Sequence, residues 1–177
     1  MIQQDVTVTV GTPSNHSEWL QQPLNMLSSC SSWQFAFCGG DNLSTDIVRK
    51  FAALDISNLD LVSVYGAAEV SIMCCAGVVD YKEYSEDTEG KLVPVGVALP
   101  DYQLWIGDHL GRALPAWTGD VWVGDSGISG GYIDAGNVDD HCFQTRSDTG
   151  ARCFRTGDRG FINDSGILFV VSRHLDK

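Results

Sequence analysis

Apolar runs at regular intervals along the first 64 residues are the feature that most constrains the fold. Residues 6–10 alternate apolar and polar side chains, as a half-buried strand does. Residues 33–38 and 59–64 are predominantly apolar and are typical of buried strands. The three runs therefore predict three strands of one sheet.

Helical patterns fill the two intervals between these strands. Ser44 can cap a helix whose apolar residues share one face, namely Ile47, Val48, Phe51 and Leu54. Asn15, with Glu18 three residues later, can cap a shorter helix in the first interval. The order strand, helix, strand, helix, strand predicts a parallel, layered α/β unit.

The pattern changes in the second half of the chain. Short strands are expected at residues 102–106, 120–123, 132–133 and 167–171, separated by glycine-containing turns rather than by helices. Such spacing favours an antiparallel sheet or a small barrel. The predicted organisation is an α/β portion at 1–79, an acidic surface loop at 80–91 and a β-rich portion at 92–177.

Charge and composition exclude several classes of function. A net charge of −12 with only 11 Lys and Arg residues argues against a nucleic-acid partner. A phosphate-bearing small molecule is compatible, because backbone N–H groups and a metal can hold its charge. The sequence contains no run of about 20 apolar residues, so no membrane span is predicted. The N-terminus lacks a signal-peptide pattern, so a cytoplasmic protein is expected. The six cysteines show no zinc-site spacing and are expected to be reduced and mostly buried.

Polar residues follow two of the predicted parallel strands. Gly39, Gly40 and Asp41 follow the second strand, and Tyr65 and Glu69 follow the third. Ligands of open α/β sheets bind at the carboxyl ends of strands, where a tyrosine ring can stack on a purine and a carboxylate can hold a hard cation. Plain turn architecture is the alternative, and the residues by themselves favour it over a ligand site.

Two further clusters lie towards the C-terminus. Asp158 follows Gly157 in an expected tight loop, where its carboxylate can either bond its own backbone or accept both hydroxyls of a ribose. A polar segment, residues 172–177, follows the last predicted strand.

The order of these motifs resembles that of adenylate-forming enzymes, specifically the adenylation domains of nonribosomal peptide synthetases and fungal hybrid polyketide–peptide synthetases. The stretches that carry the resemblance, in chain order, are SSWQFAFCGGDNLS, VYGAAE, the segment that begins VPVGVALPDYQLWIG, FRTGDRG and SRHLDK. Together they extend over nearly the whole chain. The fold implied is part of the N-terminal subdomain of such an enzyme, a layered α/β unit followed by a β-rich, barrel-like half.

The resemblance implies roles for individual residues. Tyr65 would stack on adenine, Asp158 would bind the ribose hydroxyls and Glu69 would hold Mg²⁺. The remaining nucleotide contacts would come from Gly39, Gly40, Asp41, Ser63, Gly66 and Arg173. The substrate pocket would include Gly11, Ala36, Cys38, Val64, Ile72 and Met73.

The activity implied is ATP-dependent activation of an amino or other carboxylic acid to an acyl-adenylate, followed by transfer to the phosphopantetheine thiol of a carrier domain in cis or in trans. The family's phosphate loop would lie upstream of residue 1, and its catalytic lysine in a C-terminal subdomain reached through a hinge near Asp176. No catalytic residue is therefore assigned within this chain, and the isolated chain is expected to be inactive.

Several positions depart from the family pattern. Ser63 replaces Asn, Ala67 and Ala68 replace Pro-Thr, and Ser172 replaces Gly. Fatty-acyl-AMP ligases, which resemble the chain at Ala68, are the alternative within the superfamily. A degenerate, non-catalytic relative that binds a nucleotide or a partner is the alternative from a different class.

Overall fold

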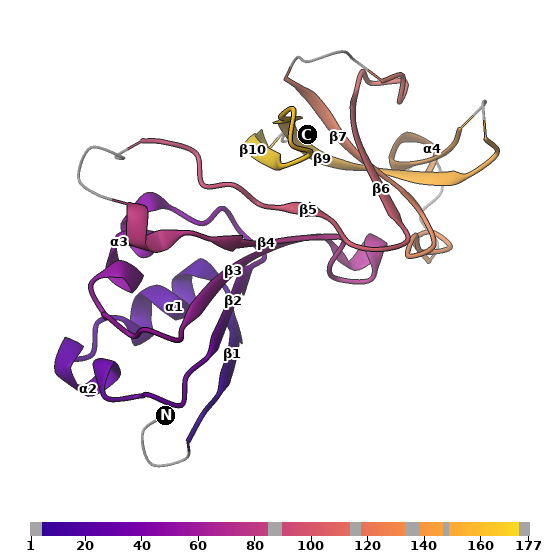
Figure 1. Cartoon of the computed structure of the whole chain (residues 1–177). Helices are drawn as coiled ribbons and strands as arrows, with labels where there is room; N and C mark the ends of the chain where they lie inside the picture. Colours follow the sequence, from indigo (N-terminus) through magenta and orange to yellow (C-terminus); the bar gives the residue numbers. More distant parts are fainter. Residues whose placement is uncertain (1–4, 85–89, 114–117, 134–138, 147–148, 174–177) are drawn as a thin grey trace. The chain divides into compact units, whose positions relative to one another are not determined.

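The computed structural model describes residues 5–84, 90–113, 118–133, 139–146 and 149–173 (Figure 1). The chain forms two compact units, residues 1–64 with 77–94 and residues 65–76 with 95–177. The first sheet has the order β1-β2-β3-β4-β5, and the division between the units falls within β3 (Asp60–Tyr65) and β4 (Cys75–Val79). The domain boundaries drawn from the sequence stay a prediction.

Three strands of the first sheet run parallel to one another. β1 (Val8–Gly11) pairs with β2 (Phe35–Gly39), and β2 pairs with β3, both in parallel. In this register Cys38 lies between Gly11 on β1 and Ser63 on β3. The predicted parallel α/β arrangement is confirmed, together with its three strands.

The described helices of the first unit are α1 (Pro13–Trp19), α2 (Leu24–Ser28), α3 (Thr45–Ala52) and the short 3₁₀ helix η3 (Tyr81–Glu83). Ser44 caps α3, as predicted. The predicted cap of α1 at Asn15 is wrong, because Thr12 is the cap and Asn15 is the third helical residue whose side chain bonds back to it. Pro13 starts this helix, since its missing N–H is not needed in the first turn.

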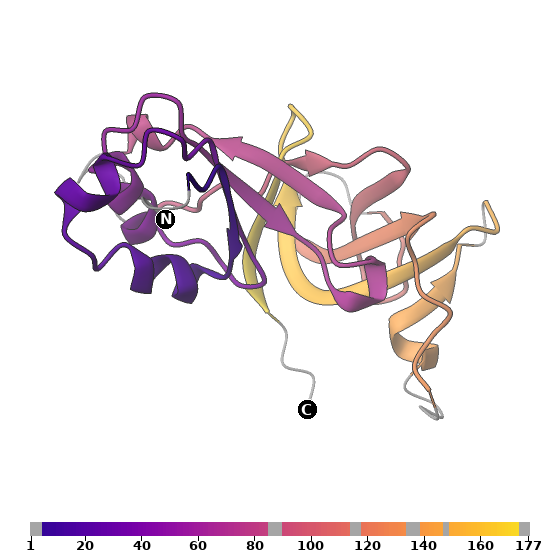
Figure 2. The ribbon, with the colours of Figure 1, turned by 90° about the horizontal axis from the view of Figure 1, so that it is seen from below.

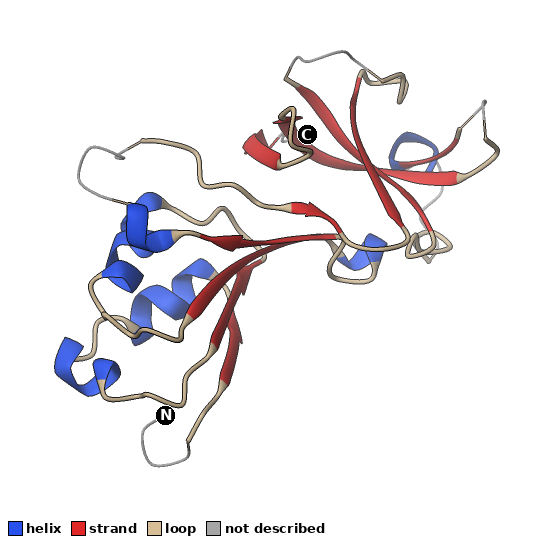
Figure 3. Cartoon of the chain, viewed as in Figure 1, coloured by secondary structure: helices blue, strands red, loops and turns tan. Residues whose placement is uncertain are grey.

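The core of the first unit lies between one face of the sheet and these helices (Figure 3). Alternate residues of β2, Ala36 and Cys38, are buried together with Val48 and Phe51 of α3. All four apolar residues predicted for the helical face, through Leu54, are buried. The period of 3.6 residues in α3 and of two in β2 therefore produces one shared apolar layer.

The second unit is built on antiparallel strands. β5 (Val97–Ala98) pairs with β4 at Cys75 and Ala76, and a second sheet has the order β10-β9-β7-β6. The strands of the second sheet are β6 (Tyr102–Gly107), β7 (Gly119–Asp125), β9 (Arg152–Ile162) and β10 (Leu168–Arg173), and β8 (Phe143–Thr145) pairs with β9. The short helices are η2 (Ala68–Val70) and α4 (Asp139–Cys142). The expected antiparallel β-rich half is confirmed.

Two expectations for this half are wrong. Residues 132–133 are not a strand. Gly157 and Asp158 do not form a loop between strands but lie inside β9, which is 11 residues long and curves along its length (Figure 2). The expectation failed because a glycine pattern that usually ends a strand here marks an irregularity within one. Part of the expected acidic loop, residues 85–89, and Asp176 lie outside the described residues.

All six cysteines are described and free, and five of them are buried, as predicted. Burial raises the pKa of the Cys38, Cys74 and Cys75 thiols to about 12 each, so these groups stay protonated and pack as small apolar residues. None of the described helices is long and apolar enough to cross a membrane.

His16 is a polar residue enclosed in the apolar core of the first unit. Its ring contacts Trp19 and Phe51, and Nδ1 lies 3.1 Å from the carbonyl oxygen of Thr12. Nε2 is buried and has no hydrogen-bond partner among the described residues. Burial lowers the pKa of His16 below its usual value of 6.5, because the enclosed imidazolium would lose its hydration.

We expect His16 to make the stability of the chain sensitive to acid. As the pH falls, the unfolded state binds the proton before the folded state does. The contribution of neutral His16 to the free energy of unfolding is therefore fully present above about pH 6.5 and is lost as the pH falls through the lowered pKa of the folded state. Chemical unfolding between about pH 7 and 5 should show this loss, with a slope of at most about 1.4 kcal/mol per pH unit from this group. His16→Phe should remove that slope, whereas exposed His109→Gln should keep it. An unchanged slope in His16→Phe would contradict the assignment.

Candidate functional site

The candidate site is organised around an irregularity in the pairing of β7 with β9. Arg155 pairs with Trp122 and Arg159 with Asp120, so three residues of β9, 156–158, face Val121 alone. Gly157 adopts φ +80°, a left-handed conformation that glycine reaches without steric cost. A bulge of this kind bends the strand and changes the direction of a side chain, which here is that of Asp158.

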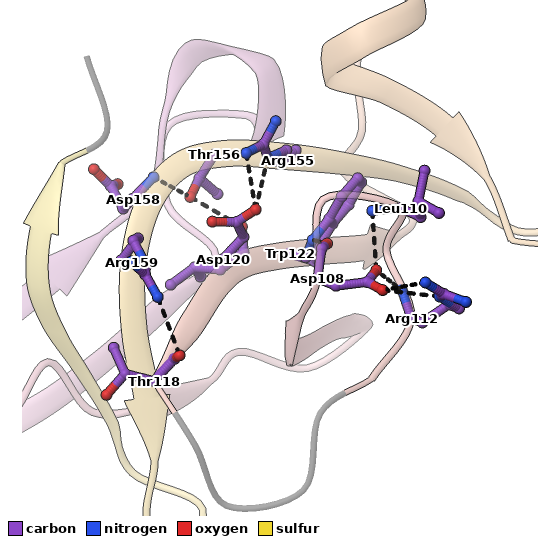
Figure 4. Close-up of polar contacts among 11 residues, drawn as sticks. Asp108, Leu110, Arg112, Thr118, Asp120, Trp122, Arg155, Thr156, Asp158 and Arg159 are labelled. Atoms are coloured by element: carbon purple, nitrogen blue, oxygen red, sulfur yellow. Dashed lines mark hydrogen bonds and ion pairs between the residues drawn. The ribbon is translucent and has the colours of Figure 1, made fainter. Parts of the chain in front are cut away.

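Thr156 satisfies backbone groups that the bulge removes from the ladder. Its hydroxyl donates to the carbonyl oxygen of Val121 at 3.0 Å and accepts from the backbone N–H of Asp158 at 3.1 Å. The conformation of the Thr-Gly-Asp triplet is thus fixed by a side chain as well as by the glycine (Figure 4).

Charged contacts hold the two strands together on both sides of the bulge. Nε and Nη2 of Arg155 each lie 2.9 Å from Oδ2 of Asp120, and both side chains are largely buried. On the other side, Nη2 of Arg159 donates to the carbonyl oxygen of Thr118 at 3.3 Å (Figure 4). A separate turn at one end of β6 is closed by Asp108, which accepts from backbone N–H groups and contacts Arg112.

Tyr65, the last residue of β3, contacts Asp158 on β9, and both residues belong to the second unit. The Tyr65 hydroxyl donates to Oδ2 of Asp158 at 2.7 Å. Arg173, which pairs with Asp158 in the β9–β10 ladder, brings its Nε to 3.9 Å from Oδ1. The structure therefore brings together three of the sequence-predicted nucleotide residues from stretches far apart in the chain.

Burial has the largest effect on the pKa values of Asp158 and Tyr65. It raises the pKa of Asp158 above its usual value, while hydrogen bonding from Tyr65 and the charge of Arg173 act in the opposite direction. Burial also raises the pKa of Tyr65 strongly, and the negative charge of Asp158 adds to this rise. Tyr65 is thus a hydrogen-bond donor at neutral pH.

Glu69 lies on η2, which begins two residues after Gly66. A Cβ atom at Gly66 would lie 2.3 Å from the carbonyl oxygen of Ile72, so only glycine fits where the chain folds back. The backbone oxygen of Glu69 accepts from the N–H of Ser129 at 2.8 Å, and its Oε1 accepts from the hydroxyl of Tyr132. The contact with Tyr132 was missed by sequence reasoning, because residues 132–133 looked like a strand and no local signal links them to Glu69.

The donors available for a metal are few. Within the described residues no group of three or more His, Cys, Asp or Glu side chains is placed to hold a metal ion. A single partly buried carboxylate at Glu69 fits Mg²⁺ rather than Zn²⁺, because Mg²⁺ commonly takes one or two protein carboxylates and completes its shell with phosphate oxygens and water.

The predicted adenine wall lies in the first unit. Gly39 has no room for a side chain, since a Cβ atom there would lie 2.4 Å from Cγ2 of Val64. Gly40 has φ +84°, and exposed Asp41 accepts from the N–H of Asn42 at 2.7 Å. Ser63 is buried beside Cys38. The geometry explains Gly39 by its close packing against Val64 and Gly40 by its left-handed backbone, and the nucleotide roles of all four residues stay predictions.

The six predicted pocket residues belong to both units. Gly11, Ala36, Cys38 and Val64 lie in the first unit, where Ala36 and Cys38 are part of the hydrophobic core. Ile72 and Met73 lie in the second unit, and Ile72 is 78% exposed. Their shared role as a substrate pocket stays a prediction.

Comparison with known proteins identifies the family of the chain. The family of AMP-binding enzymes matches residues 1–133. The chain belongs to this family. The resemblance to adenylation domains that the sequence motifs indicated is therefore confirmed.

The curated relatives of this AMP-binding chain include fungal synthetases. The hybrid PKS-NRPS synthetase phm1 of Pyrenochaetopsis sp is 35% identical over 99% of this chain and 5% of its own length. Equisetin synthetase eqxS of Fusarium heterosporum is 32% identical over 98% of this chain and 4% of its own length. The chain thus spans about one-twentieth of the curated relatives it matches.

Two solved structures share the fold at lower identity. CmiS6 superposes with a TM-score of 0.84 at 18% identity, over 96% of this chain and 40% of that one. NpsA-ThdA, an artificially fused adenylation–PCP di-domain from Klebsiella oxytoca, superposes with a TM-score of 0.78 at 16% identity, over 97% of this chain and 31% of that one. These likenesses confirm the α/β and β-rich parts as the fold of an adenylation-domain fragment.

We expect the ion pair between Asp120 and Arg155 to stabilise the bulge. Asp120→Asn removes the charge that the largely buried guanidinium faces and should lower the free energy of unfolding by about 1.5–3 kcal/mol. Asp46→Asn, which removes the exposed partner of Arg49, should change it by no more than about 1 kcal/mol. Urea unfolding of the three chains measures both values, and equal effects of the two substitutions would contradict the assignment.

Proposed function

We propose that this chain is the nucleotide-binding part of an adenylation domain that activates a carboxylic acid with ATP. The observation that carries the proposal is the contact of Tyr65 with Asp158 beside Arg173, in a chain of the AMP-binding family. An aromatic ring for a base, a carboxylate for ribose hydroxyls and a cation are then available within one unit.

Each residue has a separate task in this proposal. The ring of Tyr65 stacks on adenine and Asp158 accepts hydrogen bonds from the ribose. Glu69 holds Mg²⁺, whose charge, when bound, neutralises the phosphate oxygens. The carboxylate of the acid attacks the α-phosphorus of ATP, the bond from that phosphorus to the bridging oxygen breaks, and pyrophosphate leaves. Arg173, 72% exposed on its side chain, is available as a further nucleotide contact.

The product of this step is an acyl-adenylate. We propose that the acyl group then passes to a phosphopantetheine thiol on a carrier domain, with release of AMP. The six free cysteines fit a reducing compartment, and we place the reaction in the cytoplasm.

A first experiment tests the metal assignment in a longer protein that carries this chain within its adenylation domain. Glu69→Gln keeps the side-chain volume and removes the charge that a hard cation requires. The Mg²⁺-dependent increase in ATP affinity and the rate of ATP–pyrophosphate exchange should both fall by at least about tenfold. The melting temperature should stay close to that of the unmutated protein.

Exposed Glu18→Gln on α1 is the matched control and should leave both readouts unchanged. A Glu69→Gln protein that melts earlier but keeps its Mg²⁺ dependence would show that Glu69 is a structural turn residue. An unmutated protein that binds ATP without exchanging pyrophosphate would favour the non-catalytic alternative.

For the acid, we propose a substrate with an uncharged, apolar side chain. None of the six predicted pocket residues is charged, and a charged substrate group buried among them would lose its hydration at a cost of several kcal/mol. An exchange assay with a panel of acids should favour bulky aliphatic or aromatic side chains, and Val64→Asp should reduce that preference. A clear preference of the unmutated protein for Asp, Glu, Lys or Arg would overturn the pocket assignment.

A further inference from the structure

The Tyr65 hydroxyl has a task that stacking on a base does not require. A phenylalanine ring offers the same face to a purine, yet this hydroxyl donates to Oδ2 of Asp158 at 2.7 Å. Tyr65 ends β3 and Asp158 lies on the bulge of β9, so the bond joins two elements that are far apart in the sequence.

The bond fixes one side of a carboxylate that is otherwise free to turn. The rotation of an aspartate carboxylate about its last bond is broad and roughly two-fold. Thr156 holds the backbone N–H of Asp158, and the Tyr65 hydroxyl then fixes Oδ2. The nearest cation, Nε of Arg173, is 3.9 Å from Oδ1, beyond hydrogen-bond distance. Oδ1 is therefore oriented by its neighbours, and among the described residues it has no partner within hydrogen-bond distance.

We propose that the Tyr65 hydroxyl is a positioning group for the ribose carboxylate, so that one residue serves the base through its ring and the ribose through Asp158. This inference rests on the proposed function. It assigns ribose selectivity to a pair of residues and couples recognition of the sugar to the residue that holds the base. The hydrogen bond from the hydroxyl also favours the ionised form of Asp158, against the burial that raises the pKa of this carboxyl group.

The test measures binding of AMP and of 2′,3′-dideoxy-AMP to the chain by calorimetry. The unmutated chain should prefer AMP. Tyr65→Phe keeps the ring and should reduce that preference by about tenfold, while the affinity for the dideoxy nucleotide changes little. Asp158→Asn should also reduce the preference, and adding Tyr65→Phe to it should cause little further loss, since both act through one carboxylate.

The pH dependence separates positioning from a loss of stability. Without its donor, the Asp158 carboxyl group is protonated more easily, so the preference of Tyr65→Phe for AMP should disappear at a higher pH than that of the unmutated chain. Tyr81→Phe is the matched control. It removes a buried hydroxyl that donates to the carbonyl oxygen of Leu59 at 2.6 Å, and it should leave the preference and its pH dependence unchanged.

The outcomes separate this inference from the proposed function. An unmutated chain that does not distinguish AMP from the dideoxy nucleotide would overturn the proposed nucleotide site itself. A clear preference that Tyr65→Phe leaves intact would overturn the positioning role alone. Equal losses for both nucleotides in Tyr65→Phe would also overturn it, because the hydroxyl would then act on the base or the fold and not on the ribose.

Discussion

Three residues of β9 face one residue of β7, and the position of the candidate site depends on this mismatch. A regular ladder would alternate side chains strictly between two faces, and Asp158 would follow that alternation. The extra residues leave backbone groups without a partner on the neighbouring strand, and the Thr156 hydroxyl bonds two of these groups. The extra residues also require the left-handed conformation of Gly157. The ion pair of Asp120 with Arg155 spans the mismatch, because Asp120 pairs with Arg159 at one end and Arg155 pairs with Trp122 at the other. Two residues of the Thr-Gly-Asp motif, Thr156 and Gly157, thus form the bulge, and the bulge in turn positions Asp158.

β9 also supports Glu69, the second carboxylate of the candidate site. Arg152, the first residue of β9, donates to the carbonyl oxygens of Ser129 and Gly130 at 3.0 Å. The segment 127–132 in turn contacts Glu69 through backbone and side chain. The turn after Glu69 is strained, because Ile72 has φ +76°, a conformation that is unfavourable for a β-branched residue. Contacts from β9 and 127–132 therefore hold a turn that local sequence preferences alone would not select.

Sequence reasoning succeeded where one local pattern determines one element. The period of α3 and its cap at Ser44, and the three parallel strands, depend on residues close in the chain and were predicted. It failed where a contact overrides the pattern: Thr12 rather than Asn15 caps α1, and β9 continues through Gly157 because β7 and β10 pair with it on both sides. In the site, motifs identified Tyr65, Asp158 and Arg173 one by one. Their mutual contacts, and the link from Tyr132 to Glu69, depend on register across the fold and leave no mark in the sequence.

The chain has 23 acidic and only 11 basic residues, which constrains how it can keep carboxylates in defined positions. An arginine at each carboxylate would fix it, but it would also pair with the group that a ligand must reach. Tyrosine hydroxyls meet both requirements, because they donate one hydrogen bond, carry no charge and leave the carboxylate ionised. Asp158 and Glu69 each accept from such a hydroxyl. Under the proposed function, this negative charge would be available to a ribose hydroxyl at Asp158 and to a hard cation at Glu69. In an acidic chain, that cation would offset the charge of a polyphosphate ligand.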